Sequence, residues 1–248
     1  MTQQRSSKAN PLRRLFIADL HLHPARPEHS CALIDFCQQR VHADDELYVL
    51  GDLFEAWIGD DVGIITYADV IACFKQLTDA GTKVYFMAGN RDFLIGPLFC
   101  EATGITLLSD PTVICIDQQN VLLMHGDTLC TDDIDYQAFR GLVRSDQWQQ
   151  EFLALTPAQR MAKASEYRQQ SQSMTASKSN DIMDVNDNAV AQVMQQHGVN
   201  LLIHGHTHRP CVHQLNQGQR VVLGDWTGHF DYISWPEHES WHLIRQSI

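Results

Sequence analysis

Short apolar runs alternate with amphipathic stretches along the first hundred residues of the chain. Three of the apolar runs predict strands, at residues 15–18, 47–50 and 83–88. Three stretches with apolar residues at helical spacing predict helices, at residues 30–39, 64–80 and 97–103. Gly81 and Gly104 stand where the last two helices would end. Strands that alternate with helices indicate an α/β layered fold with mainly parallel pairing.

The second half of the chain is richer in strands. Residues 113–116 and 121–124 predict a hairpin around a polar turn, and residues 187–197 predict a helix that ends at Gly198. Further strands are expected at residues 201–203, 219–223 and 240–244. We find no internal repeat, so a single domain spanning residues 11–248 is expected. Residues 1–10 are polar, and we expect them to be frayed.

Residues 131–178 interrupt this pattern and are called the insertion below. Thr156-Pro157-Ala158-Gln159 is a good helix start, with a capping-box spacing and a proline at the first helical position. Two apolar helical stripes precede it, formed by Phe139, Leu142 and Val143 and by Trp148, Phe152 and Leu155. We interpret the insertion as a helical lid over the site. The alternative is a helical hairpin packed on the core.

Five short motifs follow the apolar runs, and each lies where a strand ends. They are Asp19-Leu20-His21, Gly51-Asp52-Leu53-Phe54-Glu55, Gly89-Asn90-Arg91-Asp92, His125-Gly126-Asp127 and Gly205-His206-Thr207-His208. In layered α/β folds, ligands bind at the carboxyl ends of the strands. The candidate ligands in these motifs are two aspartates, one asparagine and four histidines. Oxygen and imidazole donors without thiolates suit two divalent metal ions side by side, and such a pair suits the hydrolysis of phosphate esters and anhydrides.

Charge and cysteine content narrow the classes of protein that remain. The formal net charge is −12, which disfavours nonspecific nucleic-acid binding through lysine and arginine contacts to phosphates. The chain has seven cysteines and no CxxC motif, so we expect reduced, buried thiols in a cytoplasmic protein rather than a disulfide framework. No segment approaches 18 consecutive apolar residues, and no signal peptide is apparent.

The ordered motifs resemble the calcineurin-like metallophosphoesterase superfamily over nearly the whole chain. Two positions depart from the common pattern: Glu55 replaces an aspartate, and Arg91 replaces a histidine. These departures narrow the resemblance to the members that act on UDP-2,3-diacylglucosamine in the lipid A pathway of Gram-negative bacteria. Thr131-Asp132-Asp133, the segment 182–186 and Arg209-Pro210 after the last motif also carry this resemblance.

The resemblance implies a fold, a metal centre and a set of substrate contacts. The fold would be a sandwich of two β-sheets flanked by helices. Two Mn²⁺ ions would be held, one by Asp19, His21, Asp52 and His208, and the other by Asp52, Asn90, His125 and His206. The catalytic residues would be Asp52, Asn90, Arg91 and His206. Substrate contacts would fall on Asn90, Arg91, Asp133, Ser171, Thr175, Lys178 and His206. Thr175 stands where relatives often have asparagine.

The implied reaction is hydrolysis of the diphosphate to UMP and 2,3-diacylglucosamine 1-phosphate, by attack of a metal-bridging hydroxide on the uridine-side phosphorus. Arg91 can stabilise phosphate charge but cannot donate a proton at neutral pH, which suits a phosphate leaving group. The insertion would hold the acyl chains, and the protein would contact the cytoplasmic face of the inner membrane peripherally. No obligate protein partner is evident.

Other interpretations remain open. A phosphoesterase acting on nucleotides or phosphoproteins would not need an apolar insertion. A non-catalytic scaffold would be expected to have lost ligands, and all seven are present. Three smaller questions also stay open: whether Arg168 pairs with phosphate or lies on a solvated face, whether His204 is a packed core histidine or orients a ligand, and whether Asp225 fixes a ligand histidine. We favour the solvated face for Arg168 and the packed core for His204.

Overall fold

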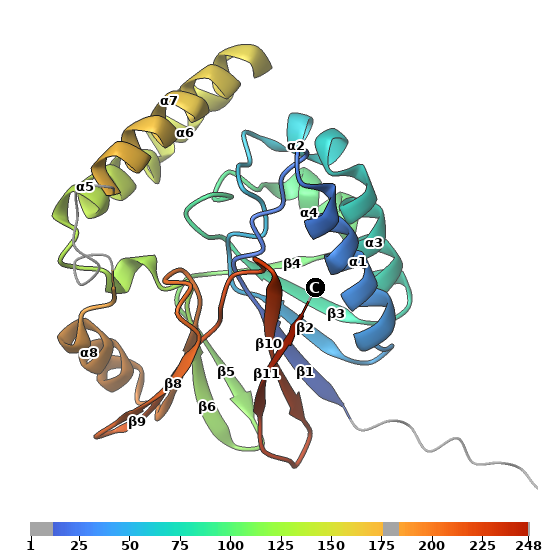
Figure 1. Cartoon of the computed structure of the whole chain (residues 1–248), viewed down its shortest axis with the longest axis vertical. Coiled ribbons are helices and arrows are strands. Elements are labelled where there is room, and N and C mark those ends of the chain that lie inside the picture. Colours follow the sequence, from blue (N-terminus) through green and yellow to red (C-terminus); the bar gives the residue numbers. More distant parts are fainter. Residues whose placement is uncertain (1–11, 176–183, 248) are drawn as a thin grey trace, which may run out of the picture.

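Two β-sheets pack face to face, and helices cover their outer faces (Figure 1). This computed structural model describes residues 12–175 and 184–247, and the expectation for residues 1–10 lies outside these ranges. The inner faces of the sheets meet in one core, where Phe16 and Tyr48 of one sheet face Leu123 and Ile203 of the other. Alternate residues of the same strands face the helices, so these strands are apolar on both faces.

The first sheet has six strands in the order β11-β10-β1-β2-β3-β4. Its strands are β1 (Arg13–Ile17), β2 (Glu46–Val49), β3 (Lys83–Met87), β4 (Thr106–Leu108), β10 (His229–Pro236) and β11 (His242–Ser247). The strands from β1 to β4 pair in parallel, whereas β10 and β11 add antiparallel strands at one edge.

The second sheet has five strands in the order β5-β6-β7-β9-β8. Its strands are β5 (Thr112–Ile116), β6 (Gln119–Leu123), β7 (Leu201–His204), β8 (Cys211–Leu215) and β9 (Gly218–Val222). Here too the central strands are parallel, and β5 and β8 are antiparallel edges. The expectation of mainly parallel pairing, which came from the first hundred residues, is confirmed for the strands β1 to β3 that lie there.

Helices on the first sheet include α1 (Pro27–Arg40), α3 (Ala68–Asp79) and α4 (Pro97–Thr103), and α8 (Asp187–His197) covers the second sheet. The single helix expected over residues 64–80 is wrong. The structure has α2 (Asp60–Thr66) and α3 instead, because Tyr67 leaves the helical conformation between them. The hydroxyl of Tyr67 donates to the carbonyl of Leu22 and so fixes this break.

The expected burial of the cysteines is only partly met. Cys37, Cys73 and Cys130 are buried, but Cys31, Cys115 and Cys211 are exposed. Cys115 lies on the edge strand β5, whose side chains alternate between the core and solvent. The apolar neighbours of Cys115 therefore indicate a strand and not burial at every position.

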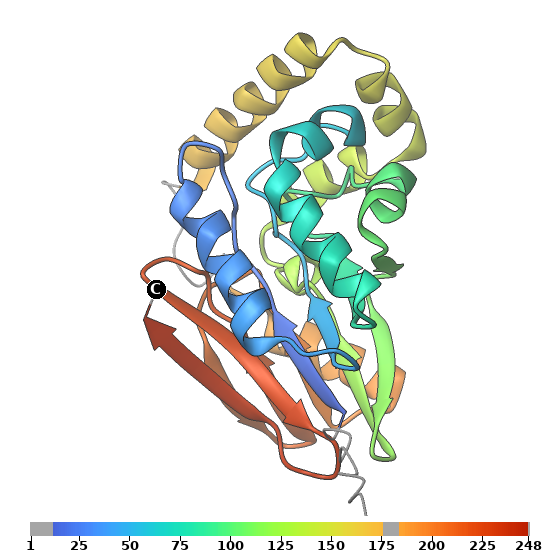
Figure 2. The ribbon, with the colours of Figure 1, turned by 90° about the vertical axis from the view of Figure 1, so that its right-hand side faces the viewer.

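The insertion folds as three helices, α5 (Ile134–Val143), α6 (Asp146–Leu153) and α7 (Pro157–Thr175). They project past one end of the two sheets (Figures 1 and 2). The helix start at Thr156 is formed as expected: the amide of Gln159 donates to Thr156, and the amide of Thr156 donates to the side chain of Gln159. Phe152 is buried against the core, and Trp148 packs beside it.

Candidate metal centre and adjoining cavity

Each of the five motifs begins just past the end of a strand, and their side chains meet at one end of the sandwich. Five of the seven expected ligands, Asp19, His21, Asp52, His206 and His208, have positive φ angles between 49° and 67°. Residues other than glycine rarely adopt this conformation, and when they do they cluster at functional sites. Backbone hydrogen bonds hold the first two loops together, from Asp19 to Gly51 and from His21 to Asp52.

One group of ligands consists of Asp19, His21 and His208, whose donor atoms lie within 4.8 Å of one another. Nε2 of His208 lies 3.3 Å from Oδ1 of Asp19 and 3.0 Å from Nε2 of His21. Asp19 is fully buried, and its Oδ1 has no hydrogen bond among the described residues. A buried carboxylate oxygen that faces two imidazole nitrogens is typical of a cation site.

A second group consists of Asp52, His125 and His206, again within 4.8 Å. Oδ1 of Asn90 completes it, at 3.0 Å from Nε2 of His125 and 3.0 Å from Nδ1 of His206. Nδ1 of His125 lies 2.9 Å from the carbonyl oxygen of Leu50, to which it can only donate. In the neutral imidazole Nδ1 then carries the proton, which leaves the lone pair of Nε2 for a cation.

Asp52 joins the two groups. Its Oδ2 lies 3.9 Å from Nε2 of His21, and its Oδ1 lies 3.7 Å from Nε2 of His125. Glycine makes this approach possible: a Cβ on Gly51, which has φ of 90°, would stand 2.5 Å from Nδ1 of His125. Gly205 allows the close approach of Asp19 in the same way, because a Cβ at Gly205 would stand 2.2 Å from a carboxylate oxygen of Asp19.

The pKa values of two histidines of the site are shifted in opposite directions. Burial disfavours the charged form of His125, but neighbouring carboxylates, Asp52 first among them, outweigh it and raise the pKa of His125 to about 9. Burial and the nearby His125 lower the pKa of His206 to about 4. The carboxylates therefore attract positive charge to this site.

This donor set fits divalent metal ions. It combines carboxylate, amide and imidazole donors with no thiolate, and divalent first-row ions accept all three. The buried Oδ1 of Asp19 and the lone pair at Nε2 of His125 point into the same space as the other donors. Among the described residues a third group, Asp117, Glu237 and His238, lies at the far end of the sandwich and is largely exposed.

Asp92 and Asp127 end two of the motifs, and they hold the site together from behind. The fully buried Asp92 accepts hydrogen bonds from the amides of Leu53 and Gly89, so it ties the second motif to the third. Burial and Asp52 raise the pKa of Asp92 to about 7. This role of Asp92 could not be predicted, because its position in the motif does not show that it faces the backbone of another loop.

Asp127 connects the site to the insertion. Its Oδ2 accepts hydrogen bonds from the hydroxyl of Tyr136 at 2.6 Å and from Nε of Arg140 at 2.7 Å, both on α5. Arg144, just after α5, donates to the carbonyl of Gly89 at 2.7 Å. These residues were missed because they look like ordinary positions of an amphipathic helix.

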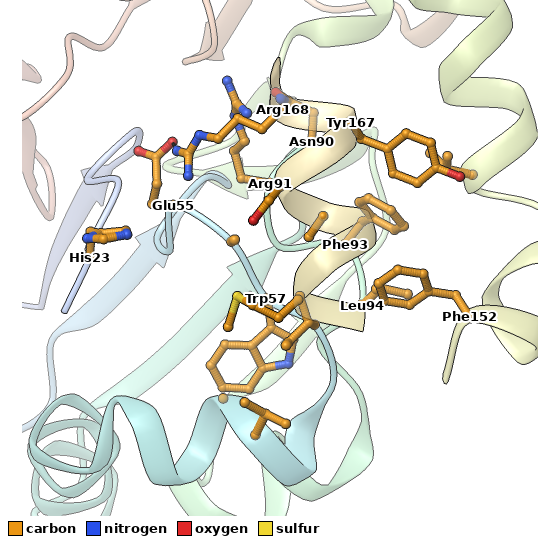
Figure 3. Close-up of a pocket in the computed structure, with 18 of the residues that line it drawn as sticks. His23, Glu55, Trp57, Asn90, Arg91, Phe93, Leu94, Phe152, Tyr167 and Arg168 are labelled. Atoms are coloured by element: carbon orange, nitrogen blue, oxygen red, sulfur yellow. Dashed lines mark ion pairs between the residues drawn. The ribbon is translucent and has the colours of Figure 1, made fainter. Parts of the chain in front are cut away.

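A cavity of about 310 Å³ lies between the insertion and the loops that follow β2 and β3 (Figure 3). Its polar end carries His23, Glu55, Asn90, Arg91 and Arg168. Its apolar part is lined by large side chains from both sides, including Trp57, Phe93, Leu94, Phe139, Phe152 and Tyr167. A polar end beside the ligands and an apolar remainder suit an amphiphilic ligand.

The expected substrate contacts are only partly brought together. Asn90 and Arg91 line the cavity, and His206 lies beside Asn90. Asp133 is not among the described residues that line the cavity. It caps α5 instead, by accepting a hydrogen bond from the amide of Tyr136. The other three expected contacts are Ser171, Thr175 and Lys178. Ser171 and Thr175 belong to α7, but their side chains lie outside the described residues, and so does the whole of Lys178.

Three open questions have structural answers. The solvated face favoured for Arg168 is wrong, because Arg168 lines the cavity and forms an ion pair with Glu55. His204 is fully buried, and its ring contacts the carbonyl of Gly205 and the guanidinium of Arg220 rather than a ligand. Asp225 lies 3.9 Å from Nδ1 of His208, on the side away from Asp19.

Comparison with known proteins gives the class of this chain. A family model for calcineurin-like phosphoesterases matches residues 12–210, and the chain belongs to this family of hydrolases and has its fold. The expected fold class is thereby confirmed.

Curated relatives are more specific. The UDP-2,3-diacylglucosamine hydrolase of Chromohalobacter salexigens is 48% identical over 216 residues, which are 86% of this chain and 88% of that protein. The protein of the same name from Enterobacter sp. (strain 638) is 50% identical, over 86% of this chain and 90% of its own length. An archaeal phosphodiesterase of known structure covers 95% of this chain and 100% of its own, at 12% identity and a TM-score of 0.49.

Proposed function

We propose that this protein hydrolyses the diphosphate of UDP-2,3-diacylglucosamine to UMP and 2,3-diacylglucosamine 1-phosphate, a step of lipid A biosynthesis. The names of its relatives support this substrate. The observation that carries the proposal is the junction of two features. Two groups of metal-ligand side chains share Asp52, and an apolar cavity opens directly beside them.

Two Mn²⁺ ions would be held by these side chains. One set is Asp19, His21, Asp52 and His208, and the other is Asp52, Asn90, His125 and His206. When bound, such a pair of ions neutralises phosphate charge and makes water a better nucleophile at neutral pH. One oxygen of Asp52, Oδ2, faces the first group of side chains, and the other, Oδ1, faces the second. This arrangement supports a bridging role for this carboxylate.

The other residues of the polar end bind and orient the diphosphate. Arg91 presents a planar guanidinium, which matches two phosphate oxygens at once, and Asn90 and His206 lie beside it. Water attacks the uridine-side phosphorus, so no protein nucleophile is needed. The leaving group is itself a phosphate, so it departs without a proton donor. Further contacts are proposed for Asp133, Ser171, Thr175 and Lys178.

The insertion, residues 131–178, would act as a lid that holds the acyl chains. The aromatic side chains between α5, α6 and α7 support this role, since each buried methylene contributes about 0.8 kcal/mol. Exposed apolar side chains on these helices, Ile134, Leu142, Leu153 and Met161, support peripheral contact with the cytoplasmic face of the inner membrane. No helix among the described residues could cross a membrane by its length and hydropathy.

Hydrolysis in ¹⁸O-labelled water tests the proposal. With UDP-2,3-diacylglucosamine and Mn²⁺, the label is expected in UMP, because water attacks the phosphorus next to uridine. Label in the sugar phosphate would contradict that assignment. UDP-glucose and dinucleoside polyphosphates serve as controls that lack acyl chains, and their hydrolysis at the same kcat/KM would contradict the substrate class.

A further inference from the structure

Glu55 stands at the position where the calcineurin-like pattern commonly has aspartate, and it lies between the metal ligands and the insertion. Its backbone is fixed: the amide of Glu55 donates to the carbonyl of Leu22, and Leu22 forms a parallel bridge with Phe54. The loop after β2 thus runs beside the loop that carries His21. This pairing places the carboxylate of Glu55 at the polar end of the cavity, where its side chain is 12% exposed.

The two oxygens of Glu55 face different partners. Oε2 lies 3.4 Å from Nδ1 of His21 and 3.3 Å from the guanidinium of Arg26, which also donates to the carbonyl of His21. Oε1 forms an ion pair with Arg168 of α7, whose side chain extends toward Glu55 (Figure 3). One carboxylate therefore contacts a metal ligand through one oxygen and the insertion through the other.

The contact with His21 has a specific consequence for metal binding. Nδ1 of His21 is buried and has no hydrogen bond among the described residues, so the carboxylate of Glu55 is the acceptor placed to receive its proton. A proton held at Nδ1 leaves the lone pair of Nε2 toward Asp52 and His208. A carboxylate behind a ligand histidine fixes its tautomer and ring orientation.

The contact with Arg168 has a consequence for the insertion. Arg168 is 30% exposed and lines the polar end of the cavity with Asn90 and Arg91. The other charged anchors of the insertion are Arg140 and Arg144, on or just after α5, and Arg160 in the first turn of α7, which pairs with Asp61. Glu55 thus contacts α7 two turns beyond Arg160, at the polar end of the cavity.

We propose that Glu55 is a positioning residue with two separable roles: through His21 it raises the metal affinity of the site, and through Arg168 it holds α7 against the core. The longer side chain of glutamate lets one carboxylate reach both partners. This inference rests on the metal ligands proposed above. Aspartate at this position is shorter by one methylene and could not reach both partners.

Four variants separate the two roles. Glu55→Ala removes both contacts, Glu55→Gln keeps an oxygen acceptor for His21 without the ionic bond to Arg168, Glu55→Asp shortens the side chain, and Arg168→Ala removes only the contact with α7. Lys163→Ala is the matched control, because Lys163 is an exposed cation of α7 outside the cavity lining.

Mn²⁺ affinity of the metal-free protein, measured by calorimetry, reports the first role. We expect Glu55→Ala to weaken binding on the order of 10–100-fold, as removal of a carboxylate behind a ligand histidine does. Arg168→Ala and Lys163→Ala are expected to bind within about twofold of the wild type. Wild-type affinity in Glu55→Ala would overturn this role. Absence of Mn²⁺ binding by the wild type would instead refute the proposed function.

Amide hydrogen exchange of residues 157–170 reports the second role without substrate or metal. We expect faster exchange in Arg168→Ala and in all three Glu55 variants, and unchanged exchange in Lys163→Ala. Unchanged exchange in both Arg168→Ala and Glu55→Gln would overturn this role. If Glu55→Ala does not fold, Glu55→Gln and Arg168→Ala still decide it.

Discussion

The two sides of the site are built by different means. On the ligand side, short loops after five strands place side chains that are mostly buried, with His208 as an exposed exception, and several of these residues have strained backbone conformations. On the insertion side, helices present half-exposed aromatic and charged side chains and meet the core through a few anchors such as Phe152 and Arg140. Rigid loops suit metal chemistry, whereas a weakly anchored helical layer suits admission of a large ligand.

The largest effect is expected on the ligand side. Arg91→Ala should lower kcat on the order of 10³-fold, as loss of an arginine that stabilises transferring phosphate does. Steady-state kinetics on the lipid substrate with saturating Mn²⁺ measures it. Arg91→Lys keeps the positive charge but not the planar guanidinium, so its kcat should lie between those of the wild type and Arg91→Ala. A kcat for Arg91→Ala within tenfold of the wild type would show that phosphate charge is stabilised elsewhere.

The junction of the two sides should be the next most sensitive place. Asp127→Ala removes the acceptor of Tyr136 and leaves Arg140 without its buried partner, which should lower the free energy of unfolding by about 3 kcal/mol. Urea denaturation of metal-free protein measures this. The control Lys75→Ala breaks an exposed ion pair with Asp79 and should cost under about 1 kcal/mol. Equal losses of unfolding free energy in Asp127→Ala and Lys75→Ala would refute the role of Asp127 in anchoring the insertion.

The smallest effect is expected within the insertion. Phe139→Ala removes one aromatic wall of the cavity and should raise KM for the diacyl substrate roughly fivefold at nearly unchanged kcat, since about 1 kcal/mol of apolar contact is lost. Ile65→Ala, on α2 and outside the cavity lining, is the control. If a short-chain diacyl analogue shows the same increase in KM, the acyl chains do not contact Phe139.

This difference between the two sides also explains what could be predicted from the sequence. The seven expected ligands could be proposed from the sequence because each lies within a few residues of a strand end, and local pattern and spacing suffice for that. The edge strands β4 and β8 were missed, and so was the inner strand β10. β4 has only three residues and is half exposed, and the pairing of β10 with β1 joins residues more than two hundred positions apart.

The roles of Asp92, Asp127 and Glu55 could not be found in the same way. Each acts on a loop or helix distant in the sequence: Asp92 on the backbone of Leu53, Asp127 on α5, and Glu55 on α7. Their residue types gave no signal beyond membership in a motif. The cavity was foreseen only as two apolar stripes, because its other wall comes from Trp57 and Phe93 of the core loops.

Metal content per chain tests the central claim most directly. We expect elemental analysis of protein reconstituted with Mn²⁺ and freed of excess metal to find two ions per wild-type chain, since the two ligand groups share Asp52. Asp52→Ala should retain fewer than one. One ion or none in the wild type, or an unchanged content in Asp52→Ala, would contradict the account.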